Sequence, residues 1–287
     1  MRRFIVLAGG GLALAAMILA QPRALRADER VTFDSAHYVV GNLQQRLARE
    51  RGEAPLRAHG PAIQGYLSKP DGAGPFPAVV HLHGCEGLTE RARKANAERT
   101  TQWGYVALAV DSFTTRAMKD DCVSQPADRQ ADAFGALLYL STLPFVDPKR
   151  IALVGHGQGG MAALQAASYR PYKLFEVPDG LSFRAVVAYY PQCNAAATNL
   201  ALPALILIGE FDDWSPIKLC EWWLQRRAGR GAPVKLVIYR EAFHGFDNPA
   251  VRNGMDFTFG HWMKYDAEAA ARAAGEMRDF LFNELSR

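Results

Sequence analysis

Apolar runs of strand length alternate along the chain with longer segments whose apolar residues recur at helical spacing. A run of Val, Ile, Leu and Ala without polar interruption predicts a strand buried on both faces, as in a parallel sheet covered by helices. The pattern predicts strands over 76–84, 105–111, 151–155, 185–191, 203–210 and 234–243, and helices over 89–104, 127–143, 157–170 and 266–286. We therefore expect an α/β fold with a mostly parallel central sheet and helices on both of its faces.

Local signals predict where several helices begin. Thr89 and Asp266 precede two of the expected helices, and both residue types cap helix N-termini. Ser215 followed by Pro216 predicts another helix start, because a capping serine and a proline at the first helical position are both favoured there. Residues 28–60 are polar and indicate no clear element.

The first 27 residues have a pattern of their own. Arg2 and Arg3 are followed by an apolar stretch over 4–20 that is rich in Gly and Ala, and then by a polar segment with small residues. This order is typical of a secretory signal peptide, so residues 1–27 are predicted to be removed and the protein to be exported, to the bacterial periplasm or beyond. An uncleaved membrane anchor is the alternative, because the apolar stretch is near the shortest length that spans a bilayer.

The charge and length of residues 28–287 limit the functions that this part of the chain is expected to have. Removing residues 1–27 takes away four arginines and no acid, so that the formal charge of +4 falls to zero. A neutral chain gives no reason to expect nucleic acid as a partner or, after cleavage, a membrane. Residues 28–287 contain no repeat, low-complexity stretch or linker, and we expect them to form a single domain. The sequence indicates no oligomeric state.

The turn after the strand at 151–155 reads GHGQGG and allows two interpretations. The spacing G-x-G-x-x-G fits a dinucleotide-binding turn, which also needs an acidic residue at the end of the next strand to bind the ribose. The next strand reads AVVAYYPQC and has no acid at its end. The other interpretation is a nucleophile elbow, G-x-S-x-G, in which Gly157 stands at the position of the attacking serine.

The elbow interpretation predicts further residues that the sequence contains. A hydrolase of this kind has an acid and then a histidine after the nucleophile position. Asp212 lies just beyond the strand in LILIGEFDD, and His244 lies just beyond the last strand, in AFHGFDNP. An early strand ends in HLHGCEGL, where an oxyanion loop is expected. Ligands bind at the carboxyl ends of parallel strands, so these residues are expected to meet there.

These blocks resemble the dienelactone hydrolase family, in particular its exported members. VVHLHGCEGL, GYVALAVDSF, DPKRIALVGHGQGG, IGEFDDWSP and AFHGFDNP occur in the order of the family's blocks, over roughly residues 60–285. The resemblance implies an α/β-hydrolase fold and the hydrolysis of a small ester or lactone, with no metal or organic cofactor.

The resemblance also implies roles for single residues. Asp212 is expected to be the acid and His244 the base, and the backbone N–H groups of Cys85 and Gln158 are expected to form the oxyanion hole. The departure is at Gly157, where the family carries Ser or Cys.

Gly157 preserves the turn and removes the attacking atom, because glycine adopts strained turn conformations more readily than any other residue. Loss of a triad serine lowers turnover by about 10⁶-fold in subtilisin, while an acceleration of about 10³–10⁴-fold over water survives through binding and the oxyanion hole. We therefore expect weak or absent esterase activity.

Several accounts of Gly157 stay open at this point. A water molecule activated by His244 gives slow hydrolysis in one account, and a non-catalytic protein binds a ligand or partner in the same cleft in another. In a third account another residue attacks, and Cys85, Ser112 and Cys193 all lie near strand ends. Gly157 is also consistent with an engineered replacement of Ser or Cys in an active hydrolase.

Three further side chains are predicted to line the substrate pocket. Glu86 follows the oxyanion turn, Trp214 lies next to the acid, and Tyr190 stands at a strand end. Asp213 also neighbours the acid, and we expect it to help cap the helix that begins at Ser215.

Metal binding is not expected. His81 and His83 lie on a strand and its turn, where histidines more often make core or turn contacts, and no third ligand is evident. His156, beside the elbow, is expected to pack there.

Four cysteines follow the predicted signal peptide. An even number in an exported protein favours disulfides, and four cysteines allow three pairings. None has C-x-x-C spacing, which argues against a zinc or thioredoxin-like site. Cys193 is predicted to pair with Cys220, one strand-to-helix unit further on, which leaves Cys85 with Cys122.

Overall fold

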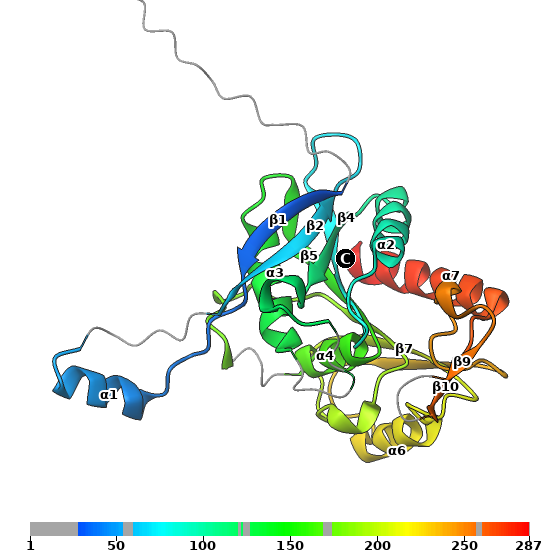
Figure 1. The fold of residues 1–287 in the computed structure, drawn as a ribbon. Helices are drawn as coiled ribbons and strands as arrows, with labels where there is room; N and C mark the ends of the chain where they lie inside the picture. The colour runs from blue at the N-terminus through cyan, green and yellow to red at the C-terminus, as the bar shows by residue number, and fades with distance from the viewer. Residues whose placement is uncertain are drawn as a thin grey trace, which may run out of the picture.

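The computed structural model describes residues 28–53, 60–119, 122, 127–168, 174–256 and 260–286. Its core is a sheet of eight strands in the order β1-β2-β4-β3-β5-β6-β7-β8 (Figure 1). β3 to β8 run parallel to one another, whereas β1 and β2 form an antiparallel edge. The strands are β1 (Glu29–Asp34), β2 (Ala62–Ser68), β3 (Phe76–Leu82), β4 (Val106–Asp111), β5 (Val146–His156), β6 (Val186–Tyr189), β7 (Ala204–Gly209) and β8 (Val234–Tyr239).

Helices cover the sheet on both faces, as predicted. α3 and α4 lie on one face and α2 and α7 on the other (Figure 1). Central strands such as β4 and β7 are buried along their whole length, which explains their unbroken apolar sequences. The helices of this layer structure are α2 (Glu90–Gln102), α3 (Arg129–Ser141), α4 (Gln158–Ala166), α6 (Ile217–Arg227) and α7 (Ala267–Leu285). Short 3₁₀ turns are η1 (Thr114–Arg116), η2 (Cys193–Ala195) and η3 (Pro249–Val251).

Two of the three predicted helix caps are confirmed and one is wrong. The side chains of Thr89 and Asp266 accept hydrogen bonds from the backbone N–H groups three residues further on, at 3.2 and 2.9 Å. Ser215 does not cap α6: the N-cap is Pro216, without a side-chain bond. The physical reason is that the Ser215 backbone N–H donates to Asp212 Oδ1 at 2.7 Å, which draws Ser215 into the turn around that carboxylate.

The polar N-terminal segment contains elements that its pattern did not predict. β1 and β2 pair as an antiparallel ribbon at the sheet edge, and α1 (Asn42–Glu50) lies away from the sheet (Figure 1). A separate pair, β9 (Met255–Asp256) and β10 (Trp262–Met263), lies near the C-terminal end. The predicted signal peptide, residues 1–27, falls outside the described residues. None of the helices described has the length and apolar character needed to cross a membrane.

Both predicted disulfides are confirmed. Cys85 pairs with Cys122 and Cys193 with Cys220, each with a Cα–Cα distance of 4.9 Å. The second bridge is buried in the core, where it ties η2 to α6. The first bridge ties the turn after β3 to the segment before α3.

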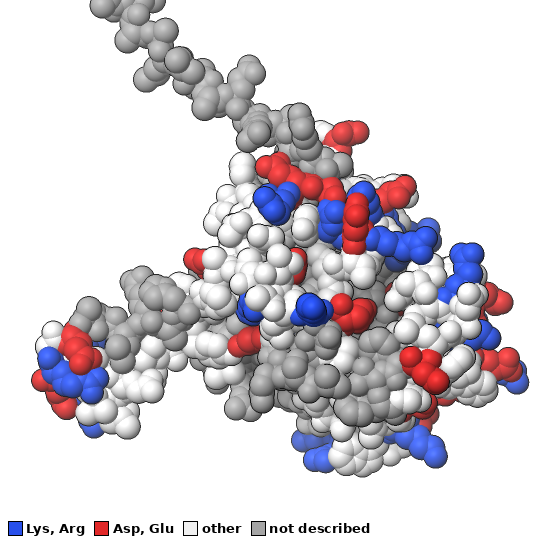
Figure 2. Space-filling view, viewed as in Figure 1, with Lys and Arg blue, Asp and Glu red and all other residues white. Residues whose placement is uncertain are grey.

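Charged side chains of both signs are interspersed on the face shown in Figure 2. Lys and Arg lie among Asp and Glu over the described surface in this view. This mixture agrees with a formal charge near zero once the N-terminal arginines are set aside.

Candidate active site

A cavity of about 320 Å³ opens at the carboxyl ends of the parallel strands. Seven residues predicted for the site line it, and they come from the turns after β3, β5, β6, β7 and β8. Parallel strands end at one edge of the sheet, so residues far apart in sequence meet there. The lining residues are Gly84, Cys85, Glu86, Cys122, Gly157, Gln158, Met161, Tyr190, Gln192, Trp214, Ser215, His244, Asn248 and Met263.

Gly157 is the single residue between β5 and α4. Its φ is +54° and its ψ −116°, a left-handed conformation that L side chains rarely adopt. A side chain at Gly155 would overlap the Gly159 carbonyl, and one at Gly159 would come within 2.6 Å of the carbonyl oxygens of Leu82 and His83, where β3 ends. The glycines of GHGQGG therefore allow a sharp strand-to-helix turn to pack directly against β3, which is the geometry of a nucleophile elbow.

The turn leaves room for a side chain at Gly157 and directs it at the base. An added Cβ would lie 3.8 Å from His244 Nε2, and 3.9 Å from both Gly84 Cα and Tyr190 Cε2. These are ordinary van der Waals distances. A Cβ at residue 157 would thus fit beside the imidazole without displacing a neighbour, although the positive φ would strain any L side chain there.

Asp212 and His244, which were predicted to be the acid and the base, are in hydrogen-bond contact. His244 Nδ1 lies 2.9 Å from Asp212 Oδ2, and both side chains are buried. The other carboxylate oxygen accepts the backbone N–H groups of Trp214 at 3.0 Å and Ser215 at 2.7 Å. With Nδ1–H donating to the carboxylate, Nε2 faces Gly157 as an acceptor, which is the tautomer a general base needs.

The two strand ends that carry this pair approach closely because of Gly209. A Cβ at Gly209, the last residue of β7, would overlap the Ala242 carbonyl in the loop after β8. The same loop is fixed by a bridge between His244 and Met263 of β10. The loop that carries His244 therefore packs directly against the turn that carries Asp212.

The expectation that Asp213 helps to cap α6 is wrong. Its carboxylate lies 3.4 Å from His261 Nδ1, and the side chain is 52% exposed. The N-cap of α6 is Pro216, which has no side-chain capping bond, and the Asp213 carboxylate is paired with His261 instead.

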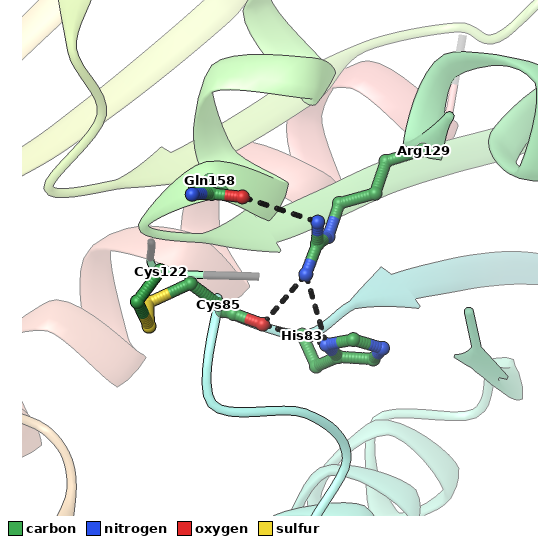
Figure 3. The surroundings of a disulfide bond; sticks show 6 residues. His83, Cys85, Cys122, Arg129 and Gln158 are labelled. Carbon is green, nitrogen blue, oxygen red and sulfur yellow. Dashed lines mark hydrogen bonds between the residues drawn. A yellow bond between two sulfur atoms is a disulfide. The ribbon is translucent and has the colours of Figure 1, made fainter. Parts of the chain in front are cut away.

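The turn after β3 is fixed from the protein interior (Figure 3). The Gly84 carbonyl accepts hydrogen bonds from Arg129 Nη2 at 2.8 Å and from His83 Nδ1 at 2.7 Å. Arg129 Nη1 also lies 3.2 Å from Oε1 of Gln158, the first residue of α4. Sequence analysis missed Arg129, because an arginine at the start of a helix is an ordinary surface residue until its burial is seen.

Tyr190 belongs to a second network beside the elbow. Its ring centroid lies 4.4 Å from that of His244, and its hydroxyl donates to Asp247 Oδ1 at 2.8 Å. The other Asp247 oxygen lies 3.2 Å from His156 Nε2. Burial and the Asp247 charge raise the pKa of Tyr190, which stays a donor. Burial alone would raise the pKa of Asp247, but His156 and the Tyr190 hydrogen bond lower it overall.

The other predicted pocket residues also reach the cavity. The Trp214 ring lies 5.0 Å from the His244 ring and stacks on His261 at 5.3 Å. The Glu86 carboxylate folds over the Gly84 Cα, where any side chain on Gly84 would overlap it. Glu86 itself is exposed at the cavity mouth.

The strand histidines make internal contacts. His81 Nε2 lies 2.9 Å from Thr100 Oγ1, and burial lowers the pKa of His81 to about 3. His83 Nε2 accepts the Ser112 N–H at 3.2 Å. Within the described part of the chain, no three His, Cys, Asp or Glu side chains are grouped so as to hold a metal ion.

Comparison with known proteins gives a family and relatives. The sequence profile of the dienelactone hydrolase family matches residues 63–285. Cutinase est1 of Thermobifida alba is 28% identical over 127 residues, which are 42% of this chain and 37% of the cutinase. The chain therefore spans well under half the length of this relative.

Solved structures of low sequence identity share the fold. A dienelactone hydrolase-like promiscuous phosphotriesterase from metagenomic libraries has a TM-score of 0.61 at 20% identity, covering 89% of this chain and 98% of its own. A thermophilic esterase of Thermogutta terrifontis has a TM-score of 0.60 at 19% identity, covering 77% and 89%. The fold is accordingly the α/β-hydrolase fold.

Proposed function

The chain belongs to the dienelactone hydrolase family, and from that premise we propose that it recognises a small carboxylic ester or lactone in a hydrolase site without an attacking side chain. The observation that carries this proposal is the geometry at Gly157. His244 Nε2 lies 3.8 Å from the position of the missing Cβ, and the imidazole is oriented by a buried carboxylate. Asp212, His244 and the turn at Gly157 thus have the arrangement that an acyl-transfer site requires, and this supports the proposal although residue 157 has no side chain to attack with.

Acyl transfer to residue 157 cannot occur in this chain, because glycine offers no nucleophile. A water molecule in the space at Gly157 is the remaining candidate for attack, with His244 as general base and the Cys85 and Gln158 N–H groups as oxyanion donors. Such a site keeps the part of catalysis that comes from binding and oxyanion stabilisation, about 10³–10⁴-fold over water in subtilisin. We therefore expect slow hydrolysis at most.

A relocated nucleophile has little support. Cys85 and Cys193 are both in disulfides, so that neither provides a thiolate. Ser112 is buried and does not line the cavity. Ser215 does line it, and an acyl group found on Ser215 would be the sign of this mechanism.

A non-catalytic binder is the second candidate function. Its support is that the cavity, with its aromatic and methionine walls, is intact although the attacking atom is missing. Binding of an ester without turnover, unchanged by His244→Ala, would favour this function.

The lining also indicates which ligands fit. Among the described residues that line the cavity, Glu86 is the one acidic side chain, and none is a lysine or an arginine. We propose that the site accepts neutral or cationic esters better than esters that carry a carboxylate.

Export of the protein is also a proposal, supported by the two disulfides, which are typical of oxidising compartments.

Hydrolysis of p-nitrophenyl acetate by residues 28–287 tests the proposed function. Gly157→Ser is expected to raise kcat by at least about 10³-fold, because it restores the nucleophile. Gly157→Ala is the matched control: it adds the same Cβ at a positive φ, a strain of about 1–2 kcal/mol, but no hydroxyl. His244→Ala in the Gly157 protein reports whether residual activity uses the base.

Three outcomes separate the alternatives. Restoration by serine but not alanine supports the hydrolase site. No restoration would contradict it and favour the binder. A burst of p-nitrophenol from the Gly157 protein itself, stoichiometric with protein, would mean that another side chain is acylated.

A further inference from the structure

Arg129 contacts both segments that carry the proposed oxyanion donors, the turn with Cys85 and the helix start at Gln158, without lining the cavity. It is the first residue of α3, and its side chain is buried, with the guanidinium 4.9 Å from the Phe113 ring centroid. From there the guanidinium contacts the Gly84 carbonyl at 2.8 Å and Gln158 Oε1 at 3.2 Å. In Figure 3 it lies between the turn after β3 and the start of α4.

The bond to Gly84 sets the direction of the Cys85 N–H. A trans peptide is planar, with its C=O and N–H pointing to opposite sides. Because Arg129 and His83 hold the Gly84 oxygen towards the interior, the N–H of the same peptide unit points the other way, towards the cavity that Gly84 and Cys85 line. The hydrogen bonds that the Gly84 carbonyl accepts therefore orient the Cys85 N–H, which is the proposed donor to an oxyanion.

His83 fixes the same carbonyl from a second side. Its Nε2 accepts the Ser112 N–H, so the ring proton is on Nδ1 and is donated to the Gly84 oxygen. Arg129 Nη2 lies 3.4 Å from that Nδ1, as expected for two donors that share one acceptor. The Gly87 N–H also donates to this oxygen, at 3.3 Å, and three donors on one carbonyl leave the peptide little freedom to rotate.

Arg129 also bonds to the side chain of Gln158, the residue that carries the second proposed oxyanion donor. Gln158 opens α4, and the first N–H groups of a helix have no intrahelical acceptor. Its side chain is restrained by Arg129, which is rooted in α3. A guanidinium suits this task, because its planar fork offers several donors in fixed directions, whereas a lysine ammonium is a single point on a flexible stem.

We infer that Arg129 is a positioning residue that acts from behind the cavity: it orients the Cys85 N–H through the carbonyl of the same peptide unit and anchors the side chain of Gln158 at the start of α4. This inference rests on the proposed function, since an oxyanion hole has a purpose only in acyl chemistry or in binding of its charged intermediates. It predicts that Arg129 affects the stabilisation of the transition state and not the binding of the ester.

The kinetic test uses Arg129→Lys in the Gly157→Ser protein. The variant keeps the positive charge and loses the forked contact, so kcat for p-nitrophenyl acetate is expected to fall by about 10–100-fold, while KM changes by less than about threefold. The matched control is Arg227→Lys. Arg227 is equally buried and donates to backbone carbonyls of Arg230 and Ala232, neither of which lines the cavity.

Arg227→Lys is expected to leave kcat within about twofold, at a comparable loss of melting temperature. Equal falls of kcat in the two lysine variants, or a change confined to KM, would overturn the inference. Either result would mean that Arg129 only supports the fold.

A second readout does not depend on activity. In the Gly157 protein, Arg129→Lys is expected to speed amide hydrogen exchange in peptides that contain Cys85 and Gln158, and Arg227→Lys is expected to leave those peptides unchanged. If Gly157→Ser shows no turnover, the proposed function fails, while the exchange data still decide whether Arg129 holds these two segments. Unchanged exchange at both segments would overturn the positioning role.

Discussion

The two sides of the cavity are held in different ways. On the acid–base side, Asp212 is held by two backbone N–H groups of its own turn and by His244. On the elbow side, Gly157 is surrounded by side-chain networks, one through Arg129 and one through Asp247. None of these bonds involves Gly157 itself. The contacts that fix the shape of the cavity therefore lie outside the residue at which the proposed hydrolase site lacks its attacking atom.

The largest expected effect tests whether the acid–base side acts only through residue 157. Asp212→Asn in the Gly157→Ser protein is expected to lower kcat by about 10⁴-fold, because the amide favours the wrong tautomer of His244. In the Gly157 protein the same change is expected to have a far smaller effect. Asp213→Asn is the matched control, since its carboxylate lies outside the pair. Equal losses in both backgrounds, measured by steady-state ester hydrolysis, would show that Asp212 holds the fold and does not orient the base.

The second largest expected effect is on the free energy of unfolding, and it compares the Asp247 network on the elbow side with the Asp213 pair on the acid–base side. Asp247→Asn weakens two charge-assisted contacts, to His156 and Tyr190, and is expected to lower the free energy of unfolding by about 2 kcal/mol at pH 7. Asp213→Asn breaks a half-exposed pair and is expected to change it by less than about 0.5 kcal/mol. Urea denaturation measures both. Similar values for the two variants would mean that the elbow side gains no stability from this network.

A pH dependence is expected from His81, which lies on β3 beside β5. Burial lowers its pKa from 6.5 to about 3, so below pH 6.5 the unfolded chain binds a proton that the folded protein does not. Stability from this group is present above pH 6.5 and is lost as the pH falls towards 3. Between pH 6.5 and 5 the loss is expected to be roughly 1.5 kcal/mol. His81→Gln should remove this part of the slope in urea titrations, and an unchanged slope would contradict the assignment.

The sequence predicted the central strands, and that Asp212 and His244 meet at their ends, because both depend on local patterns. Unbroken apolar runs mark buried strands, and Asp212 and His244 each directly follow such a run. The disulfides followed from the order of elements. β1 was missed because an edge strand with mostly exposed or half-buried residues has no strong pattern, and β2 because polar Gln64 and Gly65 interrupt its apolar residues.

Contacts between distant segments account for the other differences. The partners of Arg129 come from the turn after β3 and the start of α4, and Tyr190 meets Asp247 across 57 positions of sequence. Neither relation leaves a local signal. The cap predicted at Ser215 was wrong for the same kind of reason, because Asp212 takes up the N–H groups of that turn.

The smallest expected effect concerns ligand charge at the mouth of the cavity, between the two sides. The test compares kcat/KM for a quaternary ammonium ester with kcat/KM for its uncharged isostere, in the Gly157→Ser protein. Glu86→Gln is expected to lower the preference for the charged ester by about three- to fivefold. The effect is small because water screens an exposed carboxylate. For an ester that carries a carboxylate, kcat/KM relative to the uncharged isostere should rise. Glu90→Gln is the matched control, since Glu90 is exposed on α2 and does not line the cavity. Salt at about 0.5 M should shrink the Glu86 effect. A charge preference that survives Glu86→Gln at low salt would place the selecting group elsewhere, and the proposed ligand class would then no longer rest on Glu86.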